Sequence, residues 1–222
     1  MTALLAVHIS DGPLNDGWIA GGFAIAAVLV GLGLWRLHED EVPRIGVITA
    51  AFFVASQLHI PGGVTTVHLL LNGLVGVMLG RRAGLAIAVG LTMQFFLFAH
   101  GGLSTLGVNT TLMALPAMAA GLVFPFLRRW MRPYAAGFLL GIGAAGATVL
   151  GNFAVLVLGT NEDMTRLAQF VLLAHVPVVI IEGLIVGFVV QYLSKVRPEM
   201  LRLPAPNQPP GEQGMSAPRA SP

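Results

Sequence analysis

Imidazole side chains and glycines occur together at three places in the sequence. Imidazole is the commonest metal ligand among side chains, and it suits zinc, copper, nickel and related ions. The sequence has no cysteine, so disulfides and thiolate ligands are excluded and nitrogen or oxygen atoms must hold any metal. Four of the six histidines belong to these segments: His8-Ile-Ser-Asp11-Gly12, His59-Ile-Pro61-Gly62-Gly63-Val-Thr65-Thr66-Val-His68 and His100-Gly101-Gly102.

These histidines can bind a metal only if the chain brings the three segments to one place. The alternative is that each histidine caps carbonyl groups at a helix end or faces water. Because four of them lie in or beside three glycine-rich segments, a metal or small-cation site stays open beside that alternative. Its position depends on the elements that carry the segments.

Those elements are predicted to be membrane helices. Hydrophobic residues make up 55% of the chain and charged residues only 10%, whereas a soluble domain carries about a quarter charged residues. The 28 glycines suit helices that pack closely in a membrane. We therefore predict an all-α integral membrane protein with about seven transmembrane helices, over Trp18–Trp35, Ile45–Ile60, Val67–Gly80, Ala83–Ala99, Asn109–Leu127, Tyr134–Gly159 and Leu167–Leu193.

The third predicted helix is short for a full span. The sequence Ile60-Pro61-Gly62-Gly63 between the second and third helices cannot continue a helix. Such a segment can dip into the membrane where protein or water lines it.

Basic residues predict the orientation. An outside N-terminus places ten of them on the cytoplasmic side and only Arg166 in the opposite loops; the ten are Arg36, Arg44, Arg81, Arg82, Arg128, Arg129, Arg132, Lys195, Arg197 and Arg202. The positive-inside rule therefore predicts an outside N-terminus and a cytoplasmic C-terminus, which puts the three histidine segments on the outer face. The same rule accounts for the sequence pI near 9.7, since the net charge is only +2, and we expect no nucleic-acid partner.

The rest of the chain carries little chemistry. Residues 204–222 have the composition of a disordered cytoplasmic tail, and no P-loop motif is present for ATP hydrolysis. Glu182 is an intramembrane carboxylate that we place towards the cytoplasmic half, far from the outer loops, with a helix-packing or partner-contact role. His175 is expected to bond to a neighbouring helix, and the glycines from Gly137 to Gly151 are expected to allow close helix packing.

Four segments, taken in order, resemble the CbiM/NikM family, the substrate-binding membrane components of cobalt and nickel energy-coupling factor transporters. The first three are His8-Ile-Ser-Asp11-Gly12, Ile60-Pro61-Gly62-Gly63-Val-Thr65-Thr66-Val-His68-Leu69 and Ala99-His100-Gly101-Gly102-Leu-Ser104-Thr105-Leu-Gly107-Val-Asn109. The fourth, His175-Val-Pro177-Val-Val-Ile-Ile-Glu182-Gly183-Leu184, is similar to the family's last helix. The resemblance covers residues 8 to about 193.

The resemblance implies a flat site of four nitrogen atoms. These are the terminal amine, the amide nitrogen and imidazole of the second residue, and a histidine from the Pro-Gly-Gly loop. Carried over, the imidazoles belong to His8 and His68. The flat geometry favours Ni²⁺ and suits Co²⁺, and because both ions accept this ligand set the sequence does not choose between them. Asn109, His100 and Thr66 would orient these ligands, and Pro61, Gly62, Gly63, Gly101 and Gly102 would form the loops over the metal.

His8 departs from the family pattern because it is the eighth residue and not the second. Val7 supplies a free amine only if it is the true N-terminal residue. Our hypothesis is that residues 1–7 reflect a misassigned start, because valine can be encoded by GTG, which bacteria also use to initiate. Trimming after Ala6 would also free an amine. We then expect residues 8–203 to form the transmembrane domain.

The resemblance therefore implies the metal-capturing component of a cobalt or nickel importer in the cell (inner) membrane, with no enzymatic activity and no bound cofactor. The expected partners are a transmembrane coupling protein, cytoplasmic ATPases and, in some systems, a small accessory membrane subunit. One alternative is an intramembrane metal-dependent enzyme, for which only Asp11 or Asp16 is available outside as a general base. The other is a membrane metal-binding protein without a transport role.

Overall fold

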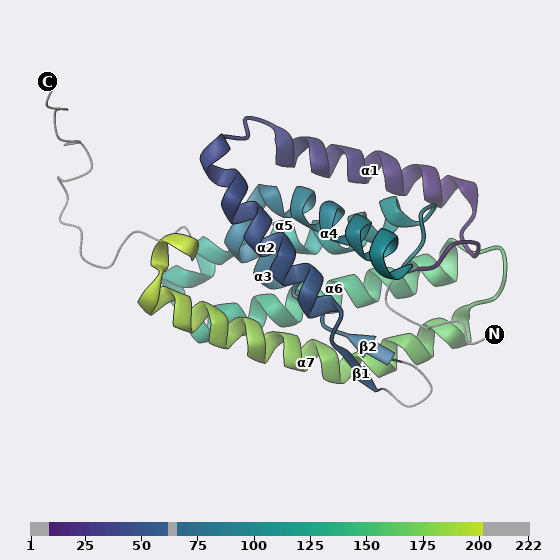
Figure 1. Ribbon diagram of the computed structural model, residues 1–222. Helices are drawn as coiled ribbons and strands as arrows, with labels where there is room; N and C mark the ends of the chain where they lie inside the picture. The colour runs from purple at the N-terminus through teal and green to yellow at the C-terminus, as the bar shows by residue number, and fades with distance from the viewer. Residues whose placement is uncertain (1–8, 62–65, 202–222) are drawn as a thin grey trace, which may run out of the picture.

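A computed structural model describes residues 9–61 and 66–201, and seven α-helices account for most of them (Figure 1). Three short 3-10 helices connect or follow them: η1 (Glu39–Glu41), η2 (Gly80–Arg82) and η3 (Pro198–Leu201). The α-helices are α1 (Asp16–Leu34), α2 (Val42–Ser56), α3 (Asn72–Leu79), α4 (Ala83–Phe98), α5 (Leu106–Trp130), α6 (Pro133–Leu158) and α7 (Thr165–Val196).

Each apolar segment predicted from the sequence overlaps one of these helices. Within the described residues, five stretches are long and apolar enough to cross a membrane: α1, the run Asn72–Phe98 that joins α3 to α4, α5, α6 and α7. Helix α2 has 15 residues, about 22 Å at 1.5 Å per residue, which is shorter than a hydrocarbon core of about 30 Å. A helical membrane architecture is confirmed, and seven separate crossings stay a prediction.

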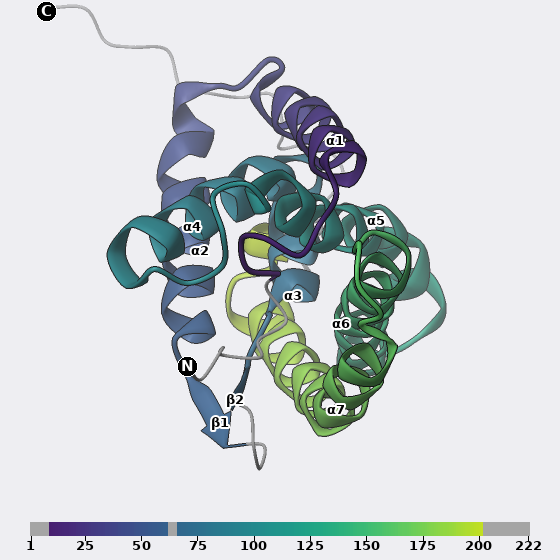
Figure 2. The ribbon, with the colours of Figure 1, turned by 90° about the vertical axis from the view of Figure 1, so that its right-hand side faces the viewer.

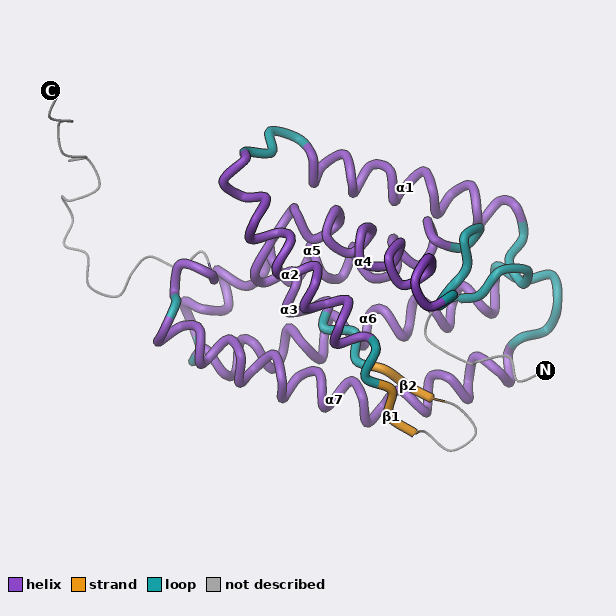
Figure 3. The backbone as a smooth tube through the Cα atoms, viewed as in Figure 1, coloured by secondary structure: helices purple, strands orange, loops and turns teal. Residues whose placement is uncertain are grey.

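The all-α prediction missed a short hairpin between α2 and α3 (Figure 3). Strands β1 (His59–Pro61) and β2 (Thr66–His68) pair antiparallel, with His59 opposite His68 and Pro61 opposite Thr66. Helix α2 therefore ends before the predicted Ile60, and α3 begins five residues after the predicted Val67. Extended backbone on both sides of the Pro-Gly-Gly sequence displaces the helix ends, and Leu71 at φ +46° makes the turn into α3.

The short helix α3 lies in the middle of the bundle (Figure 2), in contact with α2, α4, α5, α6 and α7. Seven of its eight residues are buried. Gly76 permits this packing, because a Cβ there would overlap the carbonyl group of Ala117 in α5. The buried Asn72 amide donates to Thr148 Oγ1 at 2.8 Å and to the Met113 carbonyl at 3.2 Å, so its polar group is satisfied inside the core.

The prediction for the α6 glycines holds in part. A Cβ on Gly137 or Gly141 would lie 2.8 Å from a carbonyl oxygen of α7, so these two residues do allow close packing. Gly151 similarly faces Leu112 of α5. The prediction is wrong for Gly143, which has nothing within 4 Å of an added Cβ, and for Gly146, where the contact is an ordinary one at 3.9 Å.

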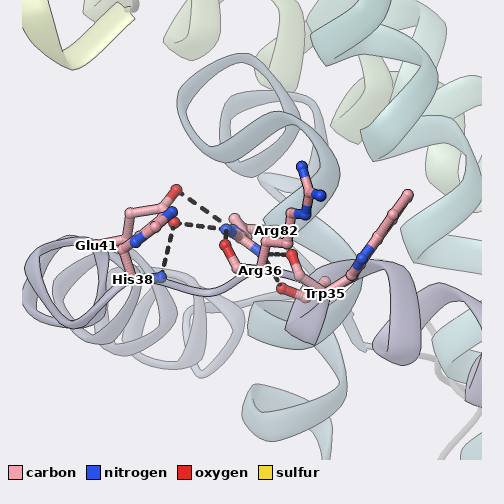
Figure 4. Close-up of polar contacts among 6 residues, drawn as sticks. Trp35, Arg36, His38, Glu41 and Arg82 are labelled. Carbon is pink, nitrogen blue, oxygen red and sulfur yellow. Dashed lines mark hydrogen bonds and ion pairs between the residues drawn. The ribbon is translucent and has the colours of Figure 1, made fainter.

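Arg82, counted above only as a cytoplasmic charge, is fully buried and holds the α1–α2 connection (Figure 4). Its guanidinium donates to the carbonyls of Gly33, Trp35 and Arg36 at 2.6–2.8 Å and pairs with Glu41 at 2.5 Å. The carbonyls belong to the C-terminal end of α1, where helix carbonyls lack intrahelical partners. A buried cation is therefore matched by a carboxylate and three backbone acceptors.

The bundle has two chemically different ends (Figure 1). One end carries the strip Ile9–Asn15, the α4–α5 loop and the α6–α7 loop, and the β-hairpin lies towards it. The other end carries the α1–α2 connection, η2, the α5–α6 turn and η3, where nearly all described basic residues are found. This separation agrees with the predicted charge asymmetry, and which end faces outward stays a prediction.

Candidate metal site

His68 ends strand β2 with its side chain fully buried. Its Nδ1 lies 3.1 Å from the carbonyl oxygen of Leu69. Because a carbonyl oxygen only accepts hydrogen bonds, Nδ1 must carry the proton in this contact. The ring lone pair then resides on Nε2, and this is the arrangement typical of a histidine that binds a metal through Nε2.

His100 lies beside His68, although 32 positions separate them in the chain. Their ring centroids are 5.3 Å apart and the planes meet at 77°. His100 lies two residues beyond the end of α4, and the chain turns there through Ala99 at φ +50° and Gly101 at φ +83°. A small cavity at this turn is lined by His100, Gly101, Gly102 and Asn109, with Leu91, Phe95 and Leu106. Four predicted site residues thus line one cavity, and one of them, His100, contacts the His68 ring.

Asn109 clamps the main chain of Ile9. Its Oδ1 accepts the Ile9 amide at 3.0 Å and its Nδ2 donates to the Ile9 carbonyl, also at 3.0 Å. Thr105 Oγ1 donates to the same carbonyl at 2.5 Å. Ile9 and Asn109 are both buried, so these bonds form out of contact with water. The clamp fixes the residue that directly follows His8.

Asp11 makes a second attachment of the same strip. Its carboxylate accepts the amides of Leu103 and Ser104 at 3.1 and 2.8 Å and the Ser104 hydroxyl at 2.5 Å. Burial raises the pKa of Asp11, but the bonds from Ser104, Leu103 and Thr105 together lower it more, so the pKa falls below its usual value. A Cβ on Gly102 would lie 2.5 Å from the Asp11 amide nitrogen and nearer still to its carboxylate, so glycine is required there.

The remaining predicted residues are less informative. His8, Val7, Gly62 and Gly63 lie outside the described residues. Pro61 and Thr66 are paired in the hairpin. Among residues 9–61 and 66–201, no three histidine, aspartate or glutamate side chains lie close enough together to hold a metal ion. Of the ligands implied by the resemblance, only His68 belongs to the described part.

Comparison with known proteins identifies the family. Residues 8–200 match the family described as "Cobalt uptake substrate-specific transmembrane region". The chain belongs to this family. A Haemophilus influenzae protein named "Putative metal transport protein" is 36% identical over 203 residues, covering 88% of this chain and 97% of that one. An Archaeoglobus fulgidus protein named "Putative fused nickel transport protein NikMN" is 35% identical over 205 residues, covering 88% and 68%.

Solved structures support the fold of this cobalt-uptake family member. A crystal structure of a transition metal transporter superposes with a TM-score of 0.74 at 23% identity, covering 85% of this chain and 93% of the other. The CbiM/NikM resemblance is therefore confirmed, and the chain is a multi-pass membrane protein of a family of transporter components. The proteins it resembles are named as transporters and not as enzymes.

Two sequence predictions about α7 are wrong. His175 was expected to bond to a neighbouring helix, but its Nδ1 donates to the Val171 carbonyl of its own helix at 2.7 Å. Glu182 was placed far from the outer loops, yet its carboxylate accepts the amides of Leu70 and Leu71, two and three residues after His68. The error came from treating the hairpin as the end of a spanning helix, when it turns back into the bundle beside α7.

The sequence analysis also did not predict that the Asp11 carboxylate attaches the N-terminal strip to the α4–α5 loop. The available indication was its position, next to Gly12 and three residues after His8, in a motif rich in small residues. Which amides it would accept depends on the α4–α5 loop, and this could be known only from the folded chain.

Proposed function

We propose that this protein captures a Co²⁺ or Ni²⁺ ion at its outer face and passes it inward as the substrate-specific component of an energy-coupling factor importer. The contact between the buried His68 and the half-buried His100, beside the clamped strip that follows His8, is the observation that carries the proposal. The family match supports transport as the purpose of the binding.

The proposed ligands are Nε2 of His68 and the imidazole of His8. If Val7 is the true N-terminal residue, its amine and the amide nitrogen of His8 complete a four-nitrogen set. Two chelate rings from one terminus force near-planarity, which Ni²⁺ prefers and Co²⁺ accepts. His100 and Asn109 are proposed to orient these groups, with Thr66 and the glycines of both loops around them.

The proposed transport step needs other subunits. The sequence has no P-loop, so ATP hydrolysis falls to cytoplasmic ATPases joined through a transmembrane coupling protein, with or without a small accessory membrane subunit. Residues 204–222 are proposed as a cytoplasmic tail and lie outside the described part.

Metal binding by the purified protein beginning at residue 7 tests the site. Ni²⁺ and Co²⁺ affinities are measured by competition with a chromophoric chelator. We expect His8→Ala and His68→Ala each to weaken binding by more than the roughly 100-fold that changes around a metal ligand cause. His38→Ala, which removes an exposed histidine of the α1–α2 connection, is the matched control and should bind normally. Wild-type affinity in both ligand variants would rule out the assigned site.

Metal uptake by cells that lack other importers tests the transport role. Uptake should require this protein together with its coupling protein and ATPases, and should fail in the His68→Ala variant. Metal binding without any metal-dependent uptake would favour the alternative, a membrane metal-binding protein that does not transport.

A further inference from the structure

We propose that Glu182 is a positioning residue for the metal site, acting on His68 through a single peptide group. This inference rests on the proposed function. Glu182 comes from the middle of α7 and its side chain is fully buried. Its carboxylate accepts the Leu70 amide through Oε1, and the Leu71 amide lies 2.9 Å from both oxygens.

The two amides lie where α3 begins. Leu71 is the N-cap residue of α3 and supplies no side-chain hydrogen bond. The first amides of a helix have no intrahelical partners, and the helix dipole favours a negative charge beside them. A carboxylate from α7 therefore accepts the two amides just before α3 and fixes the chain between β2 and α3.

The link to His68 is the peptide unit that joins Leu69 to Leu70. Its carbonyl oxygen accepts from Nδ1 of His68, and its N–H donates to Glu182. A peptide group is planar, so the direction of the N–H determines the direction of the C=O. Holding the Leu70 amide against α7 thus holds the acceptor that selects the His68 tautomer and orients its ring.

The same link affects the donor strength of the ring. Hydrogen bonds in a chain polarise one another, and the carboxylate stands at the accepting end of this one. A carboxylate bonded to the second nitrogen of a metal-binding histidine makes the ring a better ligand. Here the carboxylate is one peptide group further away and acts in the same direction.

Apolar contacts hold the peptide in place as well. Leu69 is buried against Val178, one turn before Glu182 on α7, and Leu71 packs at the edge of the same cluster. Residues 69–71 are therefore attached to α7 by side chains and by backbone hydrogen bonds. In this arrangement α7, which supplies no ligand, determines the geometry of one.

Glu182→Gln is the primary test. The amide nitrogen of glutamine donates and cannot accept, so it would face the Leu71 amide donor to donor. We expect a loss of Ni²⁺ affinity of roughly tenfold to 100-fold. We also expect a shifted visible absorption band for bound Ni²⁺, because the orientation of the His68 ring changes. Glu182→Asp keeps the charge but withdraws it, and should lose less affinity.

Arg82→Gln is the matched control, since it also removes a buried charge that holds backbone groups, but away from residues 68–71. It should lower thermal stability and leave both Ni²⁺ affinity and the absorption band unchanged. A folded Glu182→Gln protein with wild-type affinity and spectrum would overturn the proposal. So would failure of both Glu182 variants to fold while Arg82→Gln folds, because Glu182 would then serve only the fold. If the wild-type protein binds no metal, the proposed function itself fails.

Discussion

Replacing Asn109 by alanine removes the clamp on Ile9 while leaving the helices intact. The Ile9 amide loses its partner in a buried position, which costs about 1–3 kcal/mol. The Ile9 carbonyl loses one of two donors and keeps Thr105, a further loss of about 1 kcal/mol. The total is about 2–4 kcal/mol.

This cost should fall on metal binding more than on folding. The strip before α1 can detach and let water satisfy Ile9 without unfolding the bundle. The free energy needed to reattach the strip then reduces the free energy of metal binding. At about 1.4 kcal/mol per tenfold change, we expect Asn109→Ala to weaken Ni²⁺ binding by about 30- to 700-fold, with little change in Tm.

Competition with a chromophoric chelator measures the affinity, and thermal unfolding in detergent measures the stability. Asn109→Asp keeps an acceptor for the Ile9 amide but has no donor for the Ile9 carbonyl. The Ni²⁺ affinity of this variant should therefore lie between those of wild type and Asn109→Ala. Thr111→Val is the matched control, because it removes one hydrogen bond from α5 to the Gly22 carbonyl without touching Ile9. A folded Asn109→Ala protein that binds Ni²⁺ as tightly as wild type would refute the reasoning.

Three further predictions concern other contacts of the site and the fold. The lowered pKa of Asp11 means that its contribution to holding the strip is complete above its unfolded pKa of about 3.9 and is lost as pH falls through the lower folded value. Because the strip can detach without unfolding the bundle, hydrogen exchange of the Ile9 amide is the measurement: the difference in its protection between wild type and Asp11→Asn should be constant near neutrality and vanish in strong acid, and a difference that grows in acid would contradict this. Gly102→Ala should displace Asp11 and lower Ni²⁺ affinity about tenfold, whereas Gly143→Ala, with open space around it, should not; equal effects would show that the contact is unimportant. Arg82→Gln leaves Glu41 and the α1 carbonyls without their cation and should destabilise the fold by about 3–5 kcal/mol, seen as a lower Tm; an unchanged Tm would disprove its structural role.

Several features of the fold and site were predictable because they depend on local composition. Apolar length located all seven helical segments, and the Pro61-Gly62 sequence located the break between α2 and α3. The histidine and glycine segments were predicted to lie together, and two of their histidines, His68 and His100, do lie side by side. Charge asymmetry anticipated the basic end. Each of these features follows from the composition of one segment or from the charges added along the chain.

Other features were wrong or absent in the prediction because they depend on two distant segments at once. The hairpin register, the helical partner of His175 and the contact between Glu182 and the amides before α3 could not be deduced from spacing. Nothing in the local sequence indicates that Arg82 is buried while the neighbouring Arg81 is exposed. Contacts between distant segments depend on how the helices pack, and the sequence of one segment does not determine that packing.

The sequence by itself therefore determined that the chain is a membrane protein, where its helices lie and which imidazoles are candidates for a metal. Those properties come from hydrophobicity and residue type, which each segment carries with it. Only the tertiary structure decided that Nδ1 of His68 meets the Leu69 carbonyl, that α5 holds the strip after His8 and that α7 holds the chain after His68. Hydrogen-bond partners depend on positions within a few tenths of an ångström, and only the packed bundle sets those positions.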